Sequence, residues 1–182
     1  MIKNIALATL LLSTGSSVLQ AEEHKNSNEF YVVAKALYTI GKTIPEGVSI
    51  LKGKSGKGMG IDIGYTLPYN FALELDTSYS KNDITEYSDG EVRALTAKYW
   101  TYAVDVTYTL PVTHSLALMG KAGYEFEHEK LDGRTKKDNG MVYGAGVEYH
   151  INEHYEGIVE YEDSTIDSAR GSSVYAGIKY IF

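Results

Sequence analysis

The amino-acid sequence predicts an all-β fold in which eight antiparallel strands run up and down around a closed barrel. Three observations lead to this prediction. Apolar and polar residues alternate with period two from Phe30 onward, which places them on opposite faces of strands. The connections between these segments alternate between short and long, as they do in consecutive hairpins. The sequence GYTLP at residues 64–68 returns as TYTLP at residues 107–111, so the hairpin ends repeat.

The composition fits one folded domain and excludes several classes of protein. The chain has 182 residues, of which 43% are hydrophobic and 23% charged, so it is long enough for one ordinary domain and too apolar for a disordered tail. It has no cysteine, which excludes a disulfide scaffold, a cysteine-ligated zinc site and a thiol nucleophile. With a formal net charge of −7, the chain would be repelled by phosphate backbones, so nucleic acid is not an expected partner.

Residues 1–21 have the three-part pattern of a secretory signal peptide. Lys3 supplies the positive charge, residues 5–12 form an apolar run, and small and polar residues end at Ala21, after which we expect cleavage. The apolar run is too short to cross a bilayer as a helix. A short segment, residues 22–29, then precedes the barrel of residues 30–182.

The strands and connections follow from the alternation. Strands are expected at about 30–40, 59–67, 71–79, 100–110, 116–127, 141–149, 155–161 and 174–182. Short turns are expected at 68–70, 111–114 and 151–154, and long polar loops at about 41–57, 80–94, 129–139 and 163–172. At about 9–12 residues each, the strands have the length of tilted transmembrane strands.

Three features place the apolar face on the outside, although a soluble lipocalin-like carrier would show the same alternation with its faces exchanged. The polar face is rich in glycine, which makes room inside a narrow barrel for larger side chains. The strand length is the second feature. The third is that aromatic residues of the apolar face gather at both strand ends, as in the two aromatic girdles of a transmembrane barrel. These girdle residues are Tyr65, Tyr79, Trp100, Tyr102, Tyr108, Phe126, Tyr149, Tyr161 and Tyr180. The predicted fold is therefore a transmembrane β-barrel.

These features together resemble the small outer-membrane β-barrels of the OmpA transmembrane-domain and opacity-protein group. The resemblance implies a bacterial outer-membrane location, with both termini and residues 22–29 in the periplasm and the long loops outside the cell. It also implies an assembly signal in the last strand for the outer-membrane assembly machinery, with apolar residues at alternate positions and a terminal Phe. The matching positions are Val174, Ala176, Ile178, Tyr180 and Phe182.

The polar face would then bring a network of charged residues into the barrel interior. Its expected members are Lys35, Asp62, Glu74, Asp76, Asp105, Lys121, Glu125, Glu127, Glu148, Glu160, Glu162 and Lys179. Side chains about fill an eight-stranded barrel, so these charges are expected to form a hydrogen-bonded plug. The surplus of acids leaves a second interpretation open, a narrow cation-preferring channel.

Catalysis, a cofactor and a metal site have little support in the sequence. Only His128 lies near a long loop, with Ser78 and Ser80 as conceivable nucleophiles, and no motif frames these three residues. The histidines also lack the spacing of metal ligands.

The remaining candidates for function are the long loops, because binding is usually grafted on loops of a rigid scaffold. Basic clusters occur at Lys52, Lys54 and Lys57 and again at Arg134, Lys136 and Lys137. They suit contacts with lipopolysaccharide phosphates or host surfaces, although such clusters more often belong to solvated loops. We expect a monomeric, non-enzymatic barrel in contact with outer-membrane lipid and lipopolysaccharide. Its expected role is structural or adhesion-type, and the cation-preferring channel is the alternative.

Overall fold

A computed structural model describes residues 28–88 and 90–182 of the chain. The predicted signal peptide with its cleavage site at Ala21, and residues 22–27 of the segment that follows, lie outside the described residues. No helix among the described residues is long and apolar enough to cross a membrane.

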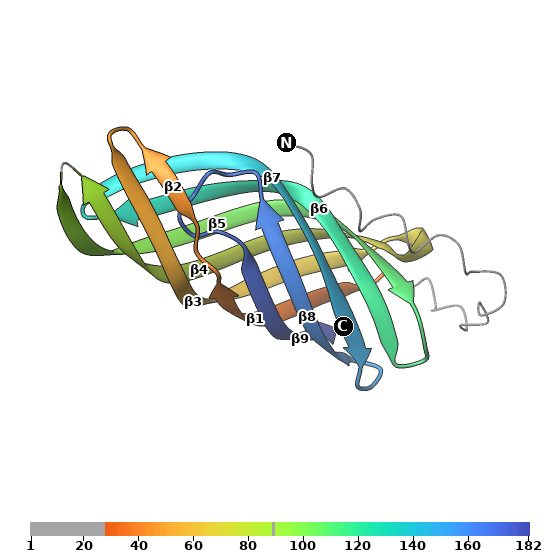
Figure 1. The fold of residues 1–182 in the computed structure, drawn as a ribbon. Helices are drawn as coiled ribbons and strands as arrows, with labels where there is room; N and C mark the ends of the chain where they lie inside the picture. Colours follow the sequence, from red (N-terminus) through yellow and green to blue (C-terminus); the bar gives the residue numbers. More distant parts are fainter. Residues whose placement is uncertain (1–27, 89) are drawn as a thin grey trace, which may run out of the picture.

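Eight long strands form a closed antiparallel ring, as predicted (Figure 1). The ring consists of β1 (Phe30–Thr39), β3 (Ser49–Thr66), β4 (Phe71–Ser88), β5 (Glu91–Pro111), β6 (Leu116–Leu131), β7 (Arg134–His150), β8 (Tyr155–Ser164) and β9 (Ser173–Ile181). Consecutive strands pair around the ring, and β1 closes it by pairing with both β3 and β9. A short ninth strand, β2 (Thr43–Glu46), pairs only with β3 and extends one hairpin beyond the ring.

The two ends of the barrel differ in their connections. At the short-turn end the strands are joined by the 3₁₀ turn η1 (Pro68–Asn70) and by residues 112–115 and 151–154. Both ends of the ring-forming chain lie at this same end, where Tyr31 pairs with Ile181 and the Phe182 N–H donates to the Phe30 carbonyl at 3.0 Å. The opposite end, the hairpin end, carries the other connections, between β1 and β3, β4 and β5, β6 and β7, and β8 and β9.

The prediction of long loops at the hairpin end is wrong for three of the four. Strand β3 already begins at Ser49, β4 and β5 continue to Ser88 and from Glu91, and β6 and β7 are separated by only two residues. These strands are 16 to 21 residues long instead of about 9–12. Only residues 165–172, between β8 and β9, form a long connection without strand structure.

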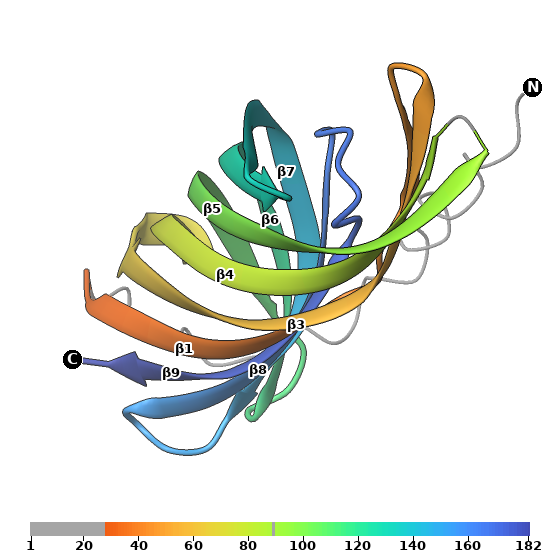
Figure 2. The same ribbon diagram turned by 90° about the vertical axis from the view of Figure 1, so that its left-hand side faces the viewer.

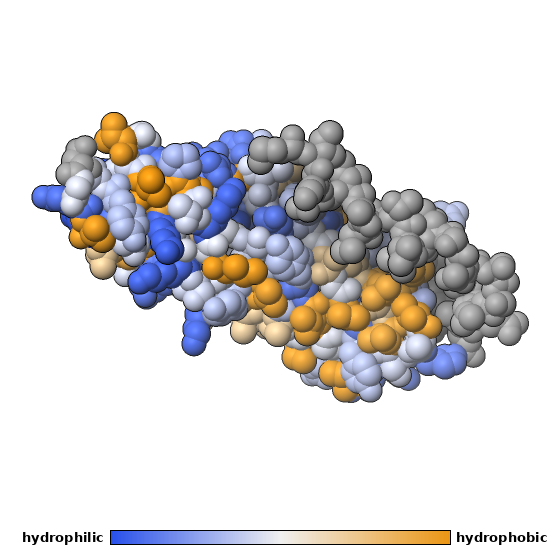
Figure 3. Space-filling view, in the orientation of Figure 1, coloured by the Kyte–Doolittle hydropathy of each residue, from blue (hydrophilic) through white to orange (hydrophobic). Residues whose placement is uncertain are grey.

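The pattern misled the prediction because the apolar and polar faces exchange places along the strands. In β4 near the short-turn end, Leu73 and Leu75 point outward and Glu74 and Asp76 inward. Farther along the same strand, Ile84 is buried inside while Lys81 and Asp83 are exposed. Figure 3 shows the result, with hydrophobic side chains (orange) gathered toward the short-turn end and hydrophilic ones (blue) more frequent toward the hairpin end. The strands therefore extend beyond the apolar belt as a hairpin extension, comprising residues 42–56, 82–97 and 129–136.

A β-bulge in β3 changes which residues of this strand face inward within the extension. The register with β4 shifts between Gly53, opposite Ile84, and Gly56, opposite Asn82. One extra residue in β3 keeps Leu51 on the inner side, where it is 1% exposed. The bulge thus lets Leu51 on one side of the shift and Gly56 on the other both face the interior.

Candidate functional site

All twelve charged residues predicted for the interior are buried inside the barrel. They lie on inward-facing positions of the ring strands, alternating with exposed apolar residues. Four more charged residues are buried that the sequence did not predict: Glu86 on β4, Glu129 on β6, Glu156 on β8 and Arg170 in the connection between β8 and β9. The charged residues form three groups along the barrel.

The central group holds two lysines among carboxylates. The Lys35 Nζ lies 2.8 Å from Asp62 Oδ2 and 2.7 Å from Asp76 Oδ2, and 4.3 Å from the centre of the Tyr175 ring. The Lys121 Nζ lies 2.9 Å from Glu160 Oε1 and 3.1 Å from Glu162 Oε2. Both lysine side chains are fully buried, so each ammonium has exchanged its water for carboxylate oxygens.

The group near the short-turn end is organised around Lys179. Its Nζ lies 2.7 Å from Glu148 Oε1 and 2.6 Å from Glu156 Oε2. The other Glu156 oxygen meets the His150 ring at 2.8 Å. The Tyr31 hydroxyl lies between this group and the centre, where it donates to Glu74 at 2.6 Å. Glu156 escaped prediction because it follows a short turn, where the alternation has barely begun.

Arg170 organises the third group, at the hairpin end. Its guanidinium lies 2.6 Å from Glu125 Oε1 and 2.9 Å from Glu127 Oε2, and both carboxylates belong to β6. Burial alone would lower the pKa of Arg170, but the two carboxylates outweigh burial and hold that pKa above its ordinary value. Arg170 therefore stays charged, and it forms ion pairs with two acids for which the sequence had indicated no partner.

Arg170 reaches these acids because its connection turns into the barrel. Ile166, Ser168, Ala169 and Arg170 are all buried, and the Ala169 carbonyl accepts a hydrogen bond from the Lys42 N–H at 3.1 Å. In Figure 2 the connection (blue) rises between β7 and the β2–β3 hairpin. We name residues 165–172 the inner loop. A polar stretch after a strand gives no signal of whether it turns inward or outward, so the sequence analysis counted it among the external loops.

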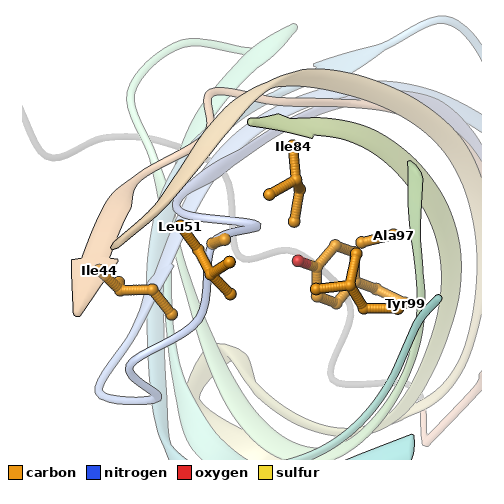
Figure 4. Close-up of a cluster of buried hydrophobic side chains, with 7 residues drawn as sticks. Ile44, Leu51, Ile84, Ala97 and Tyr99 are labelled. Carbon is orange, nitrogen blue, oxygen red and sulfur yellow. The ribbon is translucent and has the colours of Figure 1, made fainter. Parts of the chain in front are cut away.

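Apolar side chains cover the Arg170 group on the hairpin side. This cluster contains Ile44, Leu51, Ile84, Ala97, Tyr99, Leu131 and Ala169. Figure 4 looks along the barrel and shows these side chains pointing into the space enclosed by the strands. The Tyr99 hydroxyl donates to Glu129 Oε1 at 3.2 Å. The interior therefore changes from charged to apolar toward the hairpin end.

The short-turn end is hollow. A cavity of about 500 Å³ opens there, lined by the three turns and by inward residues that include Tyr31, Glu148 and Lys179. Water and small solutes on that side of the membrane therefore have access to the Lys179 group, which forms the floor of the cavity.

Two glycines support the interpretation that the polar face is rich in glycine to make room. A Cβ on Gly64 would lie 2.0 Å from the Tyr31 ring, and one on Gly123 would lie 1.9 Å from an Asp105 carboxylate oxygen. Each glycine thus leaves the space that a neighbouring interior side chain occupies.

The predicted girdle residues all lie on the outward face. Seven of the nine are exposed, and the other two, Tyr65 and Tyr79, are half-buried by neighbouring rings. The Tyr65 ring centre lies 4.7 Å from that of Phe30, and the Tyr79 ring centre 4.6 Å from that of Trp100. The five positions of the predicted assembly signal are also exposed, along β9 and at Phe182.

The residues considered for catalysis are not brought together. Ser78 and Ser80 are buried in the interior, and the Ser78 hydroxyl lies 2.6 Å from that of Thr101. His128 faces outward, with its ring 6.2 Å from that of Tyr102. The barrel wall separates it from both serines. Within residues 28–88 and 90–182, no group of three or more His, Cys, Asp or Glu is arranged to hold a metal ion.

Known structures with the same fold are outer-membrane barrels. OprG from Pseudomonas aeruginosa has a TM-score of 0.72 at 11% identity, with 86% of this chain and 97% of that chain covered. Neisserial surface protein A has a TM-score of 0.62 at 16% identity, covering 84% and 97%. Ail from Yersinia pestis, in complex with the heparin analogue sucrose octasulfate, has a TM-score of 0.55 at 14% identity, covering 86% and 100%.

Sequence comparison agrees with the fold. A search of curated proteins finds no match. The family model described as "Outer membrane protein beta-barrel domain" matches residues 6–182, which is nearly the whole chain. With a ring of eight strands, an apolar outer belt and this match, the chain belongs to the outer-membrane β-barrel family and is a protein of the bacterial outer membrane.

Proposed function

We propose that this protein is a closed, monomeric outer-membrane barrel whose hairpin end faces the cell exterior and makes surface contacts without catalysis. The observation that carries the closed state is the inner loop, because Arg170 bridges Glu125 and Glu127 beneath an apolar cluster. An ion that entered from the hairpin end would have to displace first the apolar cluster and then the Arg170 bridge. Residues 1–21 would be removed after Ala21, leaving residues 22–29 and the C-terminus in the periplasm.

The hairpin extension offers a surface for such contacts. Ile50, Tyr87 and Val92 face one another in register across β3, β4 and β5, and their side chains are 50%, 42% and 63% exposed. Tyr87 lies eight residues beyond Tyr79 of the girdle, roughly 26 Å along the strand. Apolar side chains exposed that far beyond the membrane belt are typical of contact surfaces. The heparin analogue bound to Ail supports a comparable contact role for a barrel of this fold.

The same proposal includes assembly through the last strand. The strand that closes the ring presents one apolar, outward face, formed by Val174, Ala176, Ile178, Tyr180 and Phe182. This apolar face suits recognition by the outer-membrane assembly machinery before β9 pairs with β1.

Single-channel recording tests the closed state. Refolded protein inserted in a planar bilayer should give no steady current, with insertion verified by protease protection in vesicles. Arg170→Ala, which removes the bridge, should give measurable openings, and Lys52→Ala on the exposed extension should stay silent. Steady cation-selective current through the unaltered protein would favour the alternative, a narrow channel that uses the acid surplus of the interior.

Adherence measurements test the contact role and the orientation. Laboratory bacteria that display the protein should bind cultured epithelial cells, and replacing Ile50, Tyr87 and Val92 with Ser should reduce binding several-fold at equal barrel yield. The matched control is the triple change of Thr85, Thr96 and Thr135 to Ser. Trypsin added to intact cells should cleave next to Arg134 in the β6–β7 hairpin. Cleavage only after permeabilisation would contradict the orientation.

A further inference from the structure

Four lysines face one another across four neighbouring strands. Lys57 on β3 is opposite Lys81 on β4, Lys81 is opposite Lys98 on β5, and Lys98 is opposite Lys130 on β6. All four side chains are exposed, and each is flanked along its strand by inward-facing residues. We name these four residues the lysine row. They come from four separate segments, and only Lys57 belongs to a basic cluster of the sequence.

The lysine row lies directly beyond the aromatic girdle of the hairpin end. One outward position closer to the short-turn end, the same strands carry Met59, Tyr79, Trp100 and His128, again opposite one another. The Lys81 Nζ lies 5.9 Å from the centre of the Tyr79 ring. Aromatic girdles mark the level of the lipid headgroups, so the row begins at that level. Because the strands tilt, the row climbs away from the membrane from Lys57 toward Lys130, which lies farther from its short turn.

The protein itself does not compensate this charge. Like charges directly opposite each other across a strand pair destabilise a sheet. None of the four lysines forms an ion pair within the described part of the chain, although eight other basic side chains do. Asp83, the next outward residue after Lys81, accepts a hydrogen bond from the Thr96 hydroxyl at 3.4 Å. Three consecutive like-charge pairs therefore lie on the outer face of the barrel at the membrane surface.

We propose that the lysine row binds the phosphate groups of lipopolysaccharide, the phosphorylated glycolipid of the outer leaflet. A lysine ammonium binds phosphate as a point charge, and anions between adjacent lysines would turn repulsion into attraction. The girdle rings beneath the row would contact the acyl chains of the same molecule. A climbing row matches a glycolipid whose charged groups extend outward from the membrane. The inference rests on the proposed orientation, which places the hairpin end in the outer leaflet.

Thermal unfolding in vesicles of defined lipid tests the site. The unaltered protein should unfold at a clearly higher temperature in phosphatidylcholine vesicles that contain phosphorylated lipid A than in vesicles that contain dephosphorylated lipid A. The variant with Gln at positions 57, 81, 98 and 130 should lose most of this difference. Because each variant is compared with itself in two lipids, a change in its basal stability cancels. Lys81→Gln with Lys98→Gln alone should lose about half of the difference, which covers the case in which the fourfold variant does not refold.

The matched control removes the same charge elsewhere. Gln at Lys42, Lys52, Lys54 and Lys136 should leave the difference unchanged. The proposal is overturned if the lysine-row variants keep the full difference, or if the control variant loses as much. It is also overturned if inorganic phosphate at millimolar concentration protects equally well, because the site would then bind free anions. These vesicles hold lipid A in both leaflets, so the result does not depend on orientation, which trypsin cleavage of intact cells tests separately.

Discussion

The interior of this barrel has two regions of opposite character, although β3 to β7 run through both. In the part surrounded by the apolar belt, lysines and carboxylates fill the interior and apolar residues face outward. In the hairpin extension, an apolar cluster fills the interior and lysines and other polar residues face outward. The difference teaches that the medium outside decides what lies inside. Lipid excludes charge from the outer wall, and water admits it. Side chains therefore alternate along the whole strand, but apolar residues face outward in the membrane and inward in the extension.

The largest effect is expected from breaking the charged interior. Lys121→Met should destabilise the barrel by ~3–5 kcal/mol, because it leaves Glu160 and Glu162 buried without their cation. Urea unfolding in lipid vesicles, followed by fluorescence of the single Trp, measures the change. Lys52→Met, on the exposed face of the extension, serves as the control and should change little. Equal stability of the two variants would show that the ion pairs contribute nothing.

A somewhat smaller effect is expected on the outer wall, where one substitution can be made in both regions of one strand. Leu75→Arg, midway between Phe71 and Tyr79, should cost ~2–4 kcal/mol because it places a charge in the hydrocarbon layer. Thr85→Arg, ten residues farther along the same face, should cost less than ~0.5 kcal/mol because water surrounds it. The same unfolding experiment applies. Similar costs at the two positions would contradict the exchange of faces.

The smallest effect concerns the apolar interior of the extension. Ile84→Val removes one buried methylene and should cost ~0.5–1.5 kcal/mol. Hydrogen exchange should show faster opening of amides near Ile84 and unchanged protection near Asp76 on the same strand. Uniform loss of protection along β4 would instead mean that the two regions unfold as one unit.

The sequence predicts the part of the barrel within the membrane well, and it predicts the hairpin extension and the inner loop poorly. The ring of eight strands, the outward face and the buried position of all twelve interior charges follow from alternation, because lipid enforces it at every outward position. The extension of β4 and β5 was missed because Lys81, Asp83 and Thr85 on the outside look like loop residues when water is the solvent. The inner loop was missed for a different reason. Arg170 finds Glu125 through 45 residues of sequence separation, and only the closed ring brings them together.

The inner loop also gives the barrel an order of events. It is tethered on one side by β8 and on the other by β9, the strand that meets β1 and completes the ring. In the complete ring β8 pairs with β7, β9 pairs with β1, and Arg170 lies beside Glu125 and Glu127. We therefore expect the Arg170 bridge to form only when the first strand joins the last. A barrel whose ring is still incomplete would therefore also lack the inner loop as a plug of its lumen.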